Sequence, residues 1–399
     1  MTVPEDILGG RYALGDPIAS GGMATVHLGR VSADGGFGRI VAIKRLQDDL
    51  VGSPEHESVL REEARLASRI GHPNVVATLD IVREGSEMFL VMEHVVGQSL
   101  AQLVFGSNGG KVEAKMAAGV ICGVLEGLNA AHLARGGDGK WLSIVHRDVS
   151  PENVIVGVDG LARLLDFGIA QGKGRDPVTR AGQLKGKFGY MPPEVLMGEE
   201  ATQRGDLYAA AVVFWEMLTG ERLFEAGPDG RQVDIIPQVV EGKIDPPSTR
   251  TDGIVARLDA AVMKGLSREP HARYESAREF AMAIEDCLAV ASSRRIGEWV
   301  LQRAAKPLAE RATQLEQFER RAEQLQSRRE ARAAGARTVA PKASDDPNAP
   351  TEAPGGSLTE ALRLAGAEKK RRDGLRRALG VWRALALVLA AGVVYLLFR

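Results

Sequence analysis

The middle of the chain holds polar residues of the types that can move a proton and bind a metal ion. His146, Arg147 and Asp148 are consecutive, Asn153 follows five residues after Asp148, and Asp166 comes after a run of β-type residues. An aspartate can accept the proton of an incoming hydroxyl, and amide and carboxylate oxygens are hard ligands of the kind that suit Mg²⁺. The spacing predicts a phosphoryl-transfer site. The alternative is a purely structural role, in which Asp and Asn cap a polar loop.

Two stretches nearer the N-terminus could hold the phosphates of a nucleotide. Residues 18–26 form a glycine-containing loop between two apparent strands, and such a loop lets backbone N–H groups approach phosphate oxygens. Taken alone, a glycine pair between strands more often marks a plain hairpin turn. Lys44 ends a short apolar run, where a lysine needs a partner anion, and Glu62 or Glu63 on the next helix can supply one.

The elements that must position these residues follow from the pattern of apolar side chains. Strands are expected at residues 18–28, 40–45 and 88–92. Helices are expected at residues 55–70, 113–134, 206–219 and 275–290. The sequence therefore predicts an α+β fold, with a small β-rich lobe followed by a larger helical lobe.

Composition excludes several other classes of protein. The 399 residues are 44% hydrophobic, which is enough for a real core, and the net charge of −1 argues against a nucleic-acid partner. Two cysteines, Cys122 and Cys287, give neither a disulfide framework nor a zinc spacing. The N-terminus has acidic residues and no apolar segment, so no signal peptide is expected.

Residues 11–288 resemble the catalytic domain of the bacterial eukaryotic-like (Hanks-type) Ser/Thr protein kinases. The resemblance is carried by the glycine loop and by four further motifs in the family's order, Val41-Ala42-Ile43-Lys44, His146-Arg147-Asp148 with Asn153, Asp166-Phe167-Gly168 and Met191-Pro192-Pro193-Glu194. It implies a bilobal protein-kinase fold that uses ATP and Mg²⁺ to phosphorylate Ser or Thr hydroxyls of protein substrates and of the chain itself (autophosphorylation).

The resemblance also implies a role for each matching residue. Asp148 would be the catalytic base, Lys44 would hold the α- and β-phosphates and pair with Glu63, and Asn153 and Asp166 would bind Mg²⁺. The loop over the nucleotide would comprise Ile18, Ala19, Ser20, Gly21, Gly22, Met23, Ala24, Thr25 and Val26. The adenine ring would contact Ile18, Val26, Ala42 and Ile155, beside the gatekeeper Met92 and the hinge residues Glu93, His94 and Val95.

Further positions match residues that support or regulate the family's site. Glu194 would pair with Arg273, and Asp206 would brace the catalytic loop. Thr179 is the only Ser or Thr between Asp166 and Glu194, so we expect it to be an activating phosphosite drawn toward Arg147.

Three departures from the family's pattern bear on activity. Alanine stands at two glycine positions of the loop, Ala19 and Ala24, and a Cβ there would stiffen the loop or hold it farther from the phosphates. Ser150 stands where the family has a lysine that neutralises the γ-phosphate. Lys187 stands where the family has a threonine close to that lysine.

We interpret the last two departures as a reciprocal exchange. Lys187 would reach the γ-phosphate, and the Ser150 hydroxyl would make the hydrogen bond of the missing threonine. The alternative is that Lys187 is an ordinary solvated lysine. The family's lysine usually separates Ser/Thr from Tyr kinases, so its loss weakens the sequence basis for that distinction.

Two other functions compete with an active protein kinase. A pseudokinase or scaffold is suggested by Ala19, Ala24 and Ser150, although Lys44 and Asp148 are kept. A small-molecule phosphotransferase of related fold fits the Pro-Pro-Glu segment and the separate activation loop less well.

The C-terminal third changes composition. Residues 296–337 are rich in Ala, Arg, Glu, Gln and Leu, with Leu308, Leu315, Phe318, Ala322 and Leu325 near heptad spacing and Arg311 interrupting them. A coiled coil that forms a homodimer and a solvated charged helix are both compatible with this pattern. A disordered linker is expected at residues 338–358 and a basic helix at 359–379.

Residues 380–398 form an apolar run of nineteen residues that predicts a transmembrane helix, with Arg383 near its end. The basic residues before it place its N-terminal side in the cytoplasm, so we expect a single-pass protein of the inner membrane. A terminal helix packed on a partner or lying in the membrane interface is the alternative.

Overall fold

The computed structural model describes residues 7–21, 24–32, 38–47, 51, 53–167, 188–227, 229 and 231–338. Within a few of these ranges, side chains are not described, among them Glu63 and residues 325–338. Several predicted features lie outside the described residues, namely Gly22, Met23, Gly168, Thr179, Lys187, residues 339–358 of the linker, the basic helix at 359–379 and the membrane helix at 380–398.

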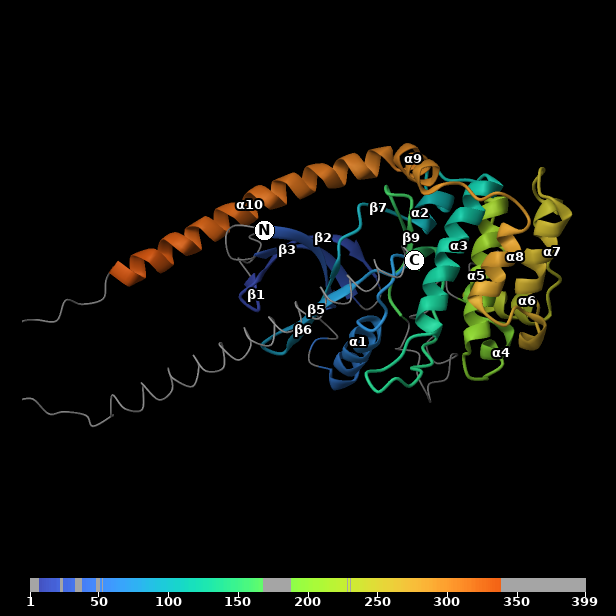
Figure 1. The fold of residues 1–399 in the computed structure, drawn as a ribbon, viewed down its shortest axis with the longest axis horizontal. Coiled ribbons are helices and arrows are strands. Elements are labelled where there is room, and N and C mark those ends of the chain that lie inside the picture. The colour runs from blue at the N-terminus through green and yellow to red at the C-terminus, as the bar shows by residue number, and fades with distance from the viewer. Residues whose placement is uncertain are drawn as a thin grey trace, which may run out of the picture. The chain divides into compact units, whose positions relative to one another are not determined.

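The N-terminal lobe is an antiparallel sheet of six strands in the order β1-β2-β3-β4-β6-β5 (Figure 1). The strands are β1 (Ile7–Leu8), β2 (Tyr12–Ser20), β3 (Ala24–Ser32), β4 (Gly38–Leu46), β5 (Thr78–Glu84) and β6 (Glu87–Glu93). One helix, α1 (Pro54–Ala67), buries Leu60 and Ala64 against the sheet residues Leu90 and Met92. Apolar residues lie on both faces of this sheet. α1 packs on one face, and the cluster on the other face consists of residues of the six strands themselves.

The C-terminal lobe is mainly helical. Its helices are α2 (Leu100–Phe105), α3 (Ala114–His132), α4 (Pro193–Leu196), α5 (Gln203–Thr219), α6 (Ile235–Glu241), α7 (Ala256–Gly265) and α8 (Ala277–Glu285). A small sheet of β7 (Gly97–Ser99), β8 (Val154–Gly157) and β9 (Ala162–Leu164) packs on α2 and α3; β7 precedes these helices in the chain, and β8 and β9 follow them. The predicted β-rich and helical lobes are therefore confirmed.

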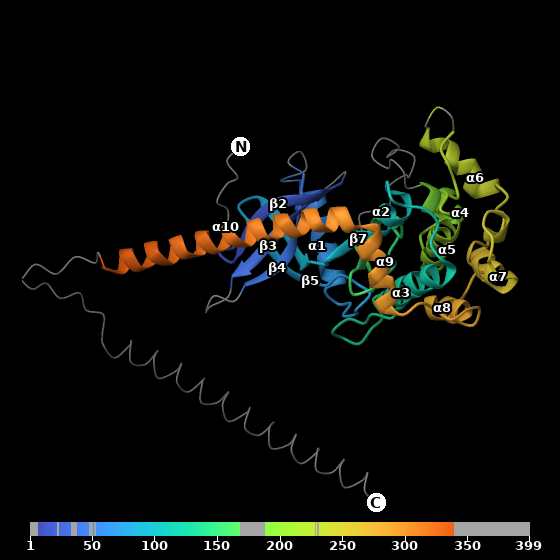
Figure 2. The same cartoon turned by 90° about the horizontal axis from the view of Figure 1, so that it is seen from above.

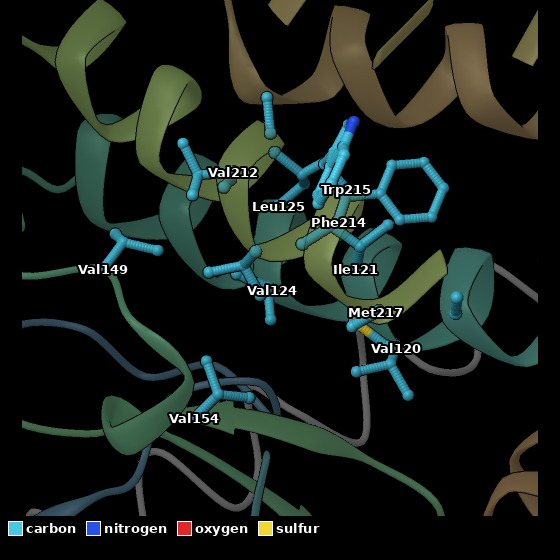
Figure 3. Packing of buried hydrophobic residues seen from close by; sticks show 14 of the residues in the cluster. Val120, Ile121, Val124, Leu125, Val149, Val154, Val212, Phe214, Trp215 and Met217 are labelled. Carbon is cyan, nitrogen blue, oxygen red and sulfur yellow. The ribbon is translucent and has the colours of Figure 1, made fainter. Parts of the chain in front are cut away.

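The core between α3 and α5 fixes the ends of the catalytic loop. Ile121 and Leu125 of α3 pack with Phe214 of α5 in a fully buried cluster (Figure 3). Val149 and Val154, on either side of residues 150–153, are buried in the same cluster. Among the described residues, α3 is the one helix long and apolar enough to cross a membrane, and more than half of it is buried in this core.

Two more helices follow the C-terminal lobe, α9 (Ser293–Arg303) and α10 (Ala305–Thr338). α9 buries Ile296, Trp299 and Val300 in the core of the helical lobe. α10 then runs alongside β2 and β3 (Figure 1 and Figure 2). The single charged segment expected at 296–337 is thus two helices, and Phe318 and Ala322 of its apolar seam pack against the chain's own β-rich lobe.

Candidate active site

One buried carboxylate binds the backbone of the catalytic loop. Asp206, in the first turn of α5, accepts hydrogen bonds from the backbone N–H groups of His146 (2.8 Å) and Arg147 (2.9 Å). Its Oδ2 also lies 2.8 Å from Nε2 of His132 at the end of α3. Arg147 has a φ of +66°, a conformation that costs an L-residue about 1–2 kcal/mol, and the Asp206 bonds offset that cost.

His146 links the loop to the strand that precedes Asp166. Its side chain is completely buried, and burial lowers the pKa of the imidazole, so the ring is neutral. Nε2 lies 3.0 Å from the carbonyl oxygen of Leu165, and Nδ1 accepts a longer bond of 3.3 Å from the N–H of Asp148. The imidazole also packs on the Phe167 ring, with centroids 4.7 Å apart. His146 therefore positions both Asp148 and Asp166.

Asp148 and Asn153 meet as the spacing predicted. The Asn153 Nδ2 donates to Oδ2 of Asp148 at 2.7 Å and to its carbonyl oxygen at 2.8 Å. Because the amide nitrogen faces Asp148, the Oδ1 oxygen of Asn153 is the side-chain atom that could bind a metal ion. The carbonyl oxygen of Asn153 accepts from the N–H of Leu165 at 2.9 Å, which ties it to the residue before Asp166. The side-chain oxygens of Asn153 and Asp166 are hard ligands of the kind that Mg²⁺ prefers.

Lys44 connects the two lobes. It lies in the centre of the sheet, opposite Val26 of β3 and Leu90 of β6, and its side chain is only 12% exposed. The ammonium lies 2.9 Å from Oδ1 of Asp166, which has a φ of +46°. The expected partner Glu63 lies on α1, but its side chain is outside the described part of the chain.

The residues predicted to contact adenine fall into two neighbouring clusters. Ala42 and Met92 are buried together, with Val26, Val95 and Ile155 packed against them. Ile18 packs instead with Ala13, Leu28 and Phe318. Ala19 and Ser20 are exposed, pairing with Val26 and Thr25, and the Gly21 N–H donates to the carbonyl oxygen of Ala24 at 2.9 Å. The hinge residue Glu93 donates its N–H to Ala77, and His94 follows it.

The pair expected between Glu194 and Arg273 is present and buried. The two Nη nitrogens of Arg273 lie 2.7 Å from the two carboxylate oxygens of Glu194, a bidentate arrangement. Arg273 also donates to the carbonyl oxygens of Ser267, Arg204 and Arg268. The pair joins the segment that carries α4 to the turn before α8.

Two polar atoms of the catalytic loop are buried without a hydrogen-bond partner among the described residues. They are Oγ of Ser150 and Nε of Arg147. Buried polar atoms are normally satisfied, so these two atoms are exceptions among the described residues. Thr179, which the sequence predicts to be drawn toward Arg147, and Lys187 lie outside the described residues.

Sequence reasoning missed a polar cluster next to the loop. Glu216 is buried in α5, and its carboxylate accepts from the Tyr190 hydroxyl at 2.7 Å and from the Leu223 N–H at 3.2 Å. Burial raises the pKa of Glu216 to about 7. Arg222 contacts Glu216 and also lies 3.5 Å from Glu152 of the catalytic loop. The available signal was a charged residue, Glu216, inside the apolar helical run of α5. A second signal of the same kind was His132 at the end of the apolar helix α3.

Comparison with known proteins gives a family match over most of the chain. The model of the protein kinase domain family matches residues 12–308. The tyrosine-protein kinase MasK of Myxococcus xanthus is 33% identical over 281 residues, which cover 70% of this chain and 43% of that protein. The serine/threonine-protein kinase PknB of Mycobacterium tuberculosis is 35% identical over 285 residues, covering 70% and 43%.

A third relative and a solved structure agree with this match. The probable serine/threonine-protein kinase SCO3848 of Streptomyces coelicolor is 34% identical over 287 residues, with 70% of this chain and 40% of that protein covered. The chain thus spans less than half the length of these relatives. The crystal structure of the Mycobacterium tuberculosis PknI kinase domain superimposes with a TM-score of 0.53 and 22% identity, covering 72% of this chain and all of that one.

Proposed function

Because the chain belongs to the protein kinase domain family, we propose that it transfers the γ-phosphoryl group of ATP to Ser or Thr hydroxyls of proteins. The observation that carries this proposal is the 2.9 Å contact between Lys44 of the β-rich lobe and Asp166 of the helical lobe. The contact brings a phosphate-binding cation and a metal-binding carboxylate to one place, beside the Asp148–Asn153 pair. Phosphoryl transfer requires this combination of positioning and charge neutralisation.

Each residue takes a role that its geometry supports. Asp148 accepts the proton of the attacking hydroxyl as the new O–P bond forms and the bond between the β- and γ-phosphates breaks, leaving ADP. Asn153 and Asp166 hold Mg²⁺, which supplies positive charge to the phosphate oxygens when bound. Lys44 steadies the α- and β-phosphates. Residues Val26, Ala42, Met92, Val95 and Ile155 form the apolar surface for adenine.

Labelled ATP with Mg²⁺ and a generic protein substrate tests this function. We expect label in the substrate and in the chain itself, and none with Asp148→Asn, which keeps the side-chain size and removes the base. A wild-type protein that binds nucleotide without any transfer would support the scaffold alternative. Label only in small-molecule acceptors would support the other phosphotransferase.

We also propose that Ser150 and Lys187 exchange roles relative to the family. The support for this is the sequence pattern, with serine at 150 and lysine at 187 where the family has lysine and threonine. The buried Oγ of Ser150 makes no hydrogen bond to a described residue. Lys187→Ala should lower the transfer rate strongly, and Ser150→Lys with Lys187→Thr should restore much of it. A Lys187→Ala protein as active as wild type contradicts the exchange.

The amino acid that accepts the phosphate is open to direct measurement. PknB is named a serine/threonine kinase and MasK a tyrosine kinase, at nearly equal identity to this chain. We propose Ser/Thr specificity. Phosphoamino-acid analysis of the labelled products decides it, and phosphotyrosine alone would overturn the proposal.

Regulation through Thr179 is a further part of the proposed function. The Nε of Arg147, buried without a hydrogen-bond partner among the described residues, supports it, because a phosphate on Thr179 would give this half-buried side chain an anionic partner. Mass spectrometry should find Thr179 phosphorylated in the active protein. Full activity with Thr179 unmodified would count against this role.

Membrane attachment through residues 380–398 is proposed from the sequence alone, with the catalytic lobes in the cytoplasm at the inner membrane. The protein should stay in the membrane fraction through high salt and carbonate washes, and release by either wash excludes a spanning helix. Homodimer formation also remains a prediction. Its expected seam contacts the chain's own lobe at Phe318 and Ala322, which leaves less apolar surface for a second copy.

A further inference from the structure

α10 is anchored on the helical lobe before it reaches the hinge. Arg303, the last residue of α9, donates from its guanidinium to four backbone carbonyl oxygens at 3.1–3.4 Å, those of Leu103, Asn108, Gly110 and Lys111. Leu308, in the first turns of α10, packs against the core of the helical lobe. The start of α10 therefore moves with that lobe.

The next contact is at the hinge. Arg311 donates from Nη1 to the Gly97 carbonyl oxygen at 2.7 Å and from Nη2 to the Gln98 Oε1 at 2.8 Å. These residues begin β7, directly after the predicted hinge at 93–95. Arg311 is also close to the hinge itself, because its charge adds to burial in lowering the pKa of His94. The residue that interrupts the heptad pattern thus binds the chain between the lobes.

Farther along, α10 packs on the β-rich lobe. Phe318 is 5% exposed and is buried with Ala322 against Ala13 of β2 and Leu28 of β3. A Cβ at Gly15 of β2 would lie 2.7 Å from the Phe318 ring, so only glycine allows this close approach. Arg321 adds an ion pair with Asp16 at 2.8 Å. The contact is therefore closely fitted to the hairpin that carries the glycine loop.

The sheet face that α10 covers is the face that carries the nucleotide residues. Val26 and Leu28 lie on the same side of β3, since alternate residues of a strand share a face. Across the sheet, Val26 is opposite Lys44 and Leu28 is opposite Ala42. Ile18, expected above adenine, belongs to the same cluster as Phe318. α10 thus continues the wall of the nucleotide site.

We propose that α10 is a positioning element of the nucleotide site, in which Phe318 sets the place of Ile18 and the glycine-loop hairpin while Arg311 sets the hinge. This proposal rests on the proposed function for the identity of the nucleotide. Neither residue touches the reacting atoms, so both act on the capture of ATP rather than on the chemical step. Loss of either contact lets the hairpin or the hinge leave the binding geometry, which reduces the binding-competent fraction.

Nucleotide affinity of the full-length protein tests the proposal. The fluorescent probe mant-ADP with Mg²⁺ is titrated into wild type, Phe318→Ala, Arg311→Gln and the control Arg320→Gln, whose side chain is 77% exposed on α10. We expect the Kd to rise about tenfold for Phe318→Ala and Arg311→Gln, with KM for ATP rising in parallel and kcat within about twofold of wild type. Arg320→Gln should match wild type, and Phe318→Leu should recover part of the loss.

Wild type gives a second readout that does not depend on the folding of a variant. By reciprocity, Mg²⁺ and ADP should slow amide hydrogen exchange in residues 311–322 as well as in the glycine loop. The proposal is overturned if folded variants bind mant-ADP as wild type does and lose only thermal stability. It is also overturned if nucleotide leaves exchange in α10 unchanged. Because mant-ADP binding needs no transfer, a protein that binds but does not phosphorylate refutes the proposed function alone.

Discussion

Replacing Arg273 by methionine tests how much the buried ion pair contributes to stability. The Arg273 side chain has no exposed surface and the Glu194 side chain is 4% exposed. All five guanidinium N–H groups have acceptors, two on Glu194 and three on backbone carbonyls. Methionine keeps much of the volume and removes every donor. It leaves a carboxylate buried without its counter-charge, together with three carbonyl oxygens that lose a donor.

The expected loss is large because the broken pair is buried. Removing one partner of such a pair costs about 3–5 kcal/mol of unfolding free energy, against a total of about 5–15 kcal/mol for a typical domain. At about 2–4 °C per kcal/mol, the melting temperature should fall by about 10 °C. The exposed pair Lys264–Glu279 gives a matched control, since both side chains are more than 40% exposed. Lys264→Met should cost less than about 1 kcal/mol.

Denaturant unfolding of the full chain measures the effect. Adding Glu194→Gln to Arg273→Met should recover part of the stability, because the unpaired charge is gone. A loss near 1 kcal/mol, or one that the second substitution does not reduce, would refute the argument.

Three further substitutions have defined outcomes. Asp206→Asn should lower kcat about 10–100-fold with little change in KM for ATP, because the amide oxygen can accept from one loop N–H group while the amide nitrogen cannot accept from the other. An unchanged kcat in steady-state kinetics would contradict this. The pKa of Glu216 is about 7 in the folded state against an ordinary 4.5, so the folded state keeps this proton to higher pH than the unfolded chain does. The free energy of unfolding should therefore fall by about 3 kcal/mol as the pH rises from 4.5 to about 7. Glu216→Gln should remove that slope in denaturant titrations, and a slope that persists would assign it elsewhere. Gly160→Ala should lower the free energy of unfolding by about 2 kcal/mol or more, since φ is +78° and the new Cβ would meet the Ser293 carbonyl oxygen. A denaturation midpoint equal to that of wild type would contradict this close contact.

Local spacing was sufficient to predict the catalytic loop and its neighbours. Asp148 and Asn153 are five residues apart in one loop, and both ends of that loop enter the core through Val149 and Val154. The pairing of Asp148 with Asn153 is therefore almost a local property. The Glu194–Arg273 pair, 79 residues apart, was expected only through the family resemblance.

Long-range partners could not be read in the same way. Lys44 contacts Asp166, 122 positions later in the chain, whereas the side chain of its expected partner Glu63 lies outside the described part of the structure. His132 and Glu216 look like isolated polar residues in apolar helices, because their partners Asp206 and Tyr190 come from other elements. Whether a charged group is buried depends on which elements pack over it, and the hydrophobic periodicity of the sequence does not predict those elements.

The sequence alone determined which chemistry is available and which residues share a face. It placed an apolar seam on residues 308–325, with Arg311 as an interruption of that seam. Tertiary structure decided what covers the seam, namely β2 and β3, and it made Arg311 a donor to the hinge. The physical reason is that hydrophobic periodicity records that a face is buried but carries no information on its partner. The identity of the partner depends on the shape and unpaired acceptors of a surface built from distant residues, such as Gly15 and Gly97.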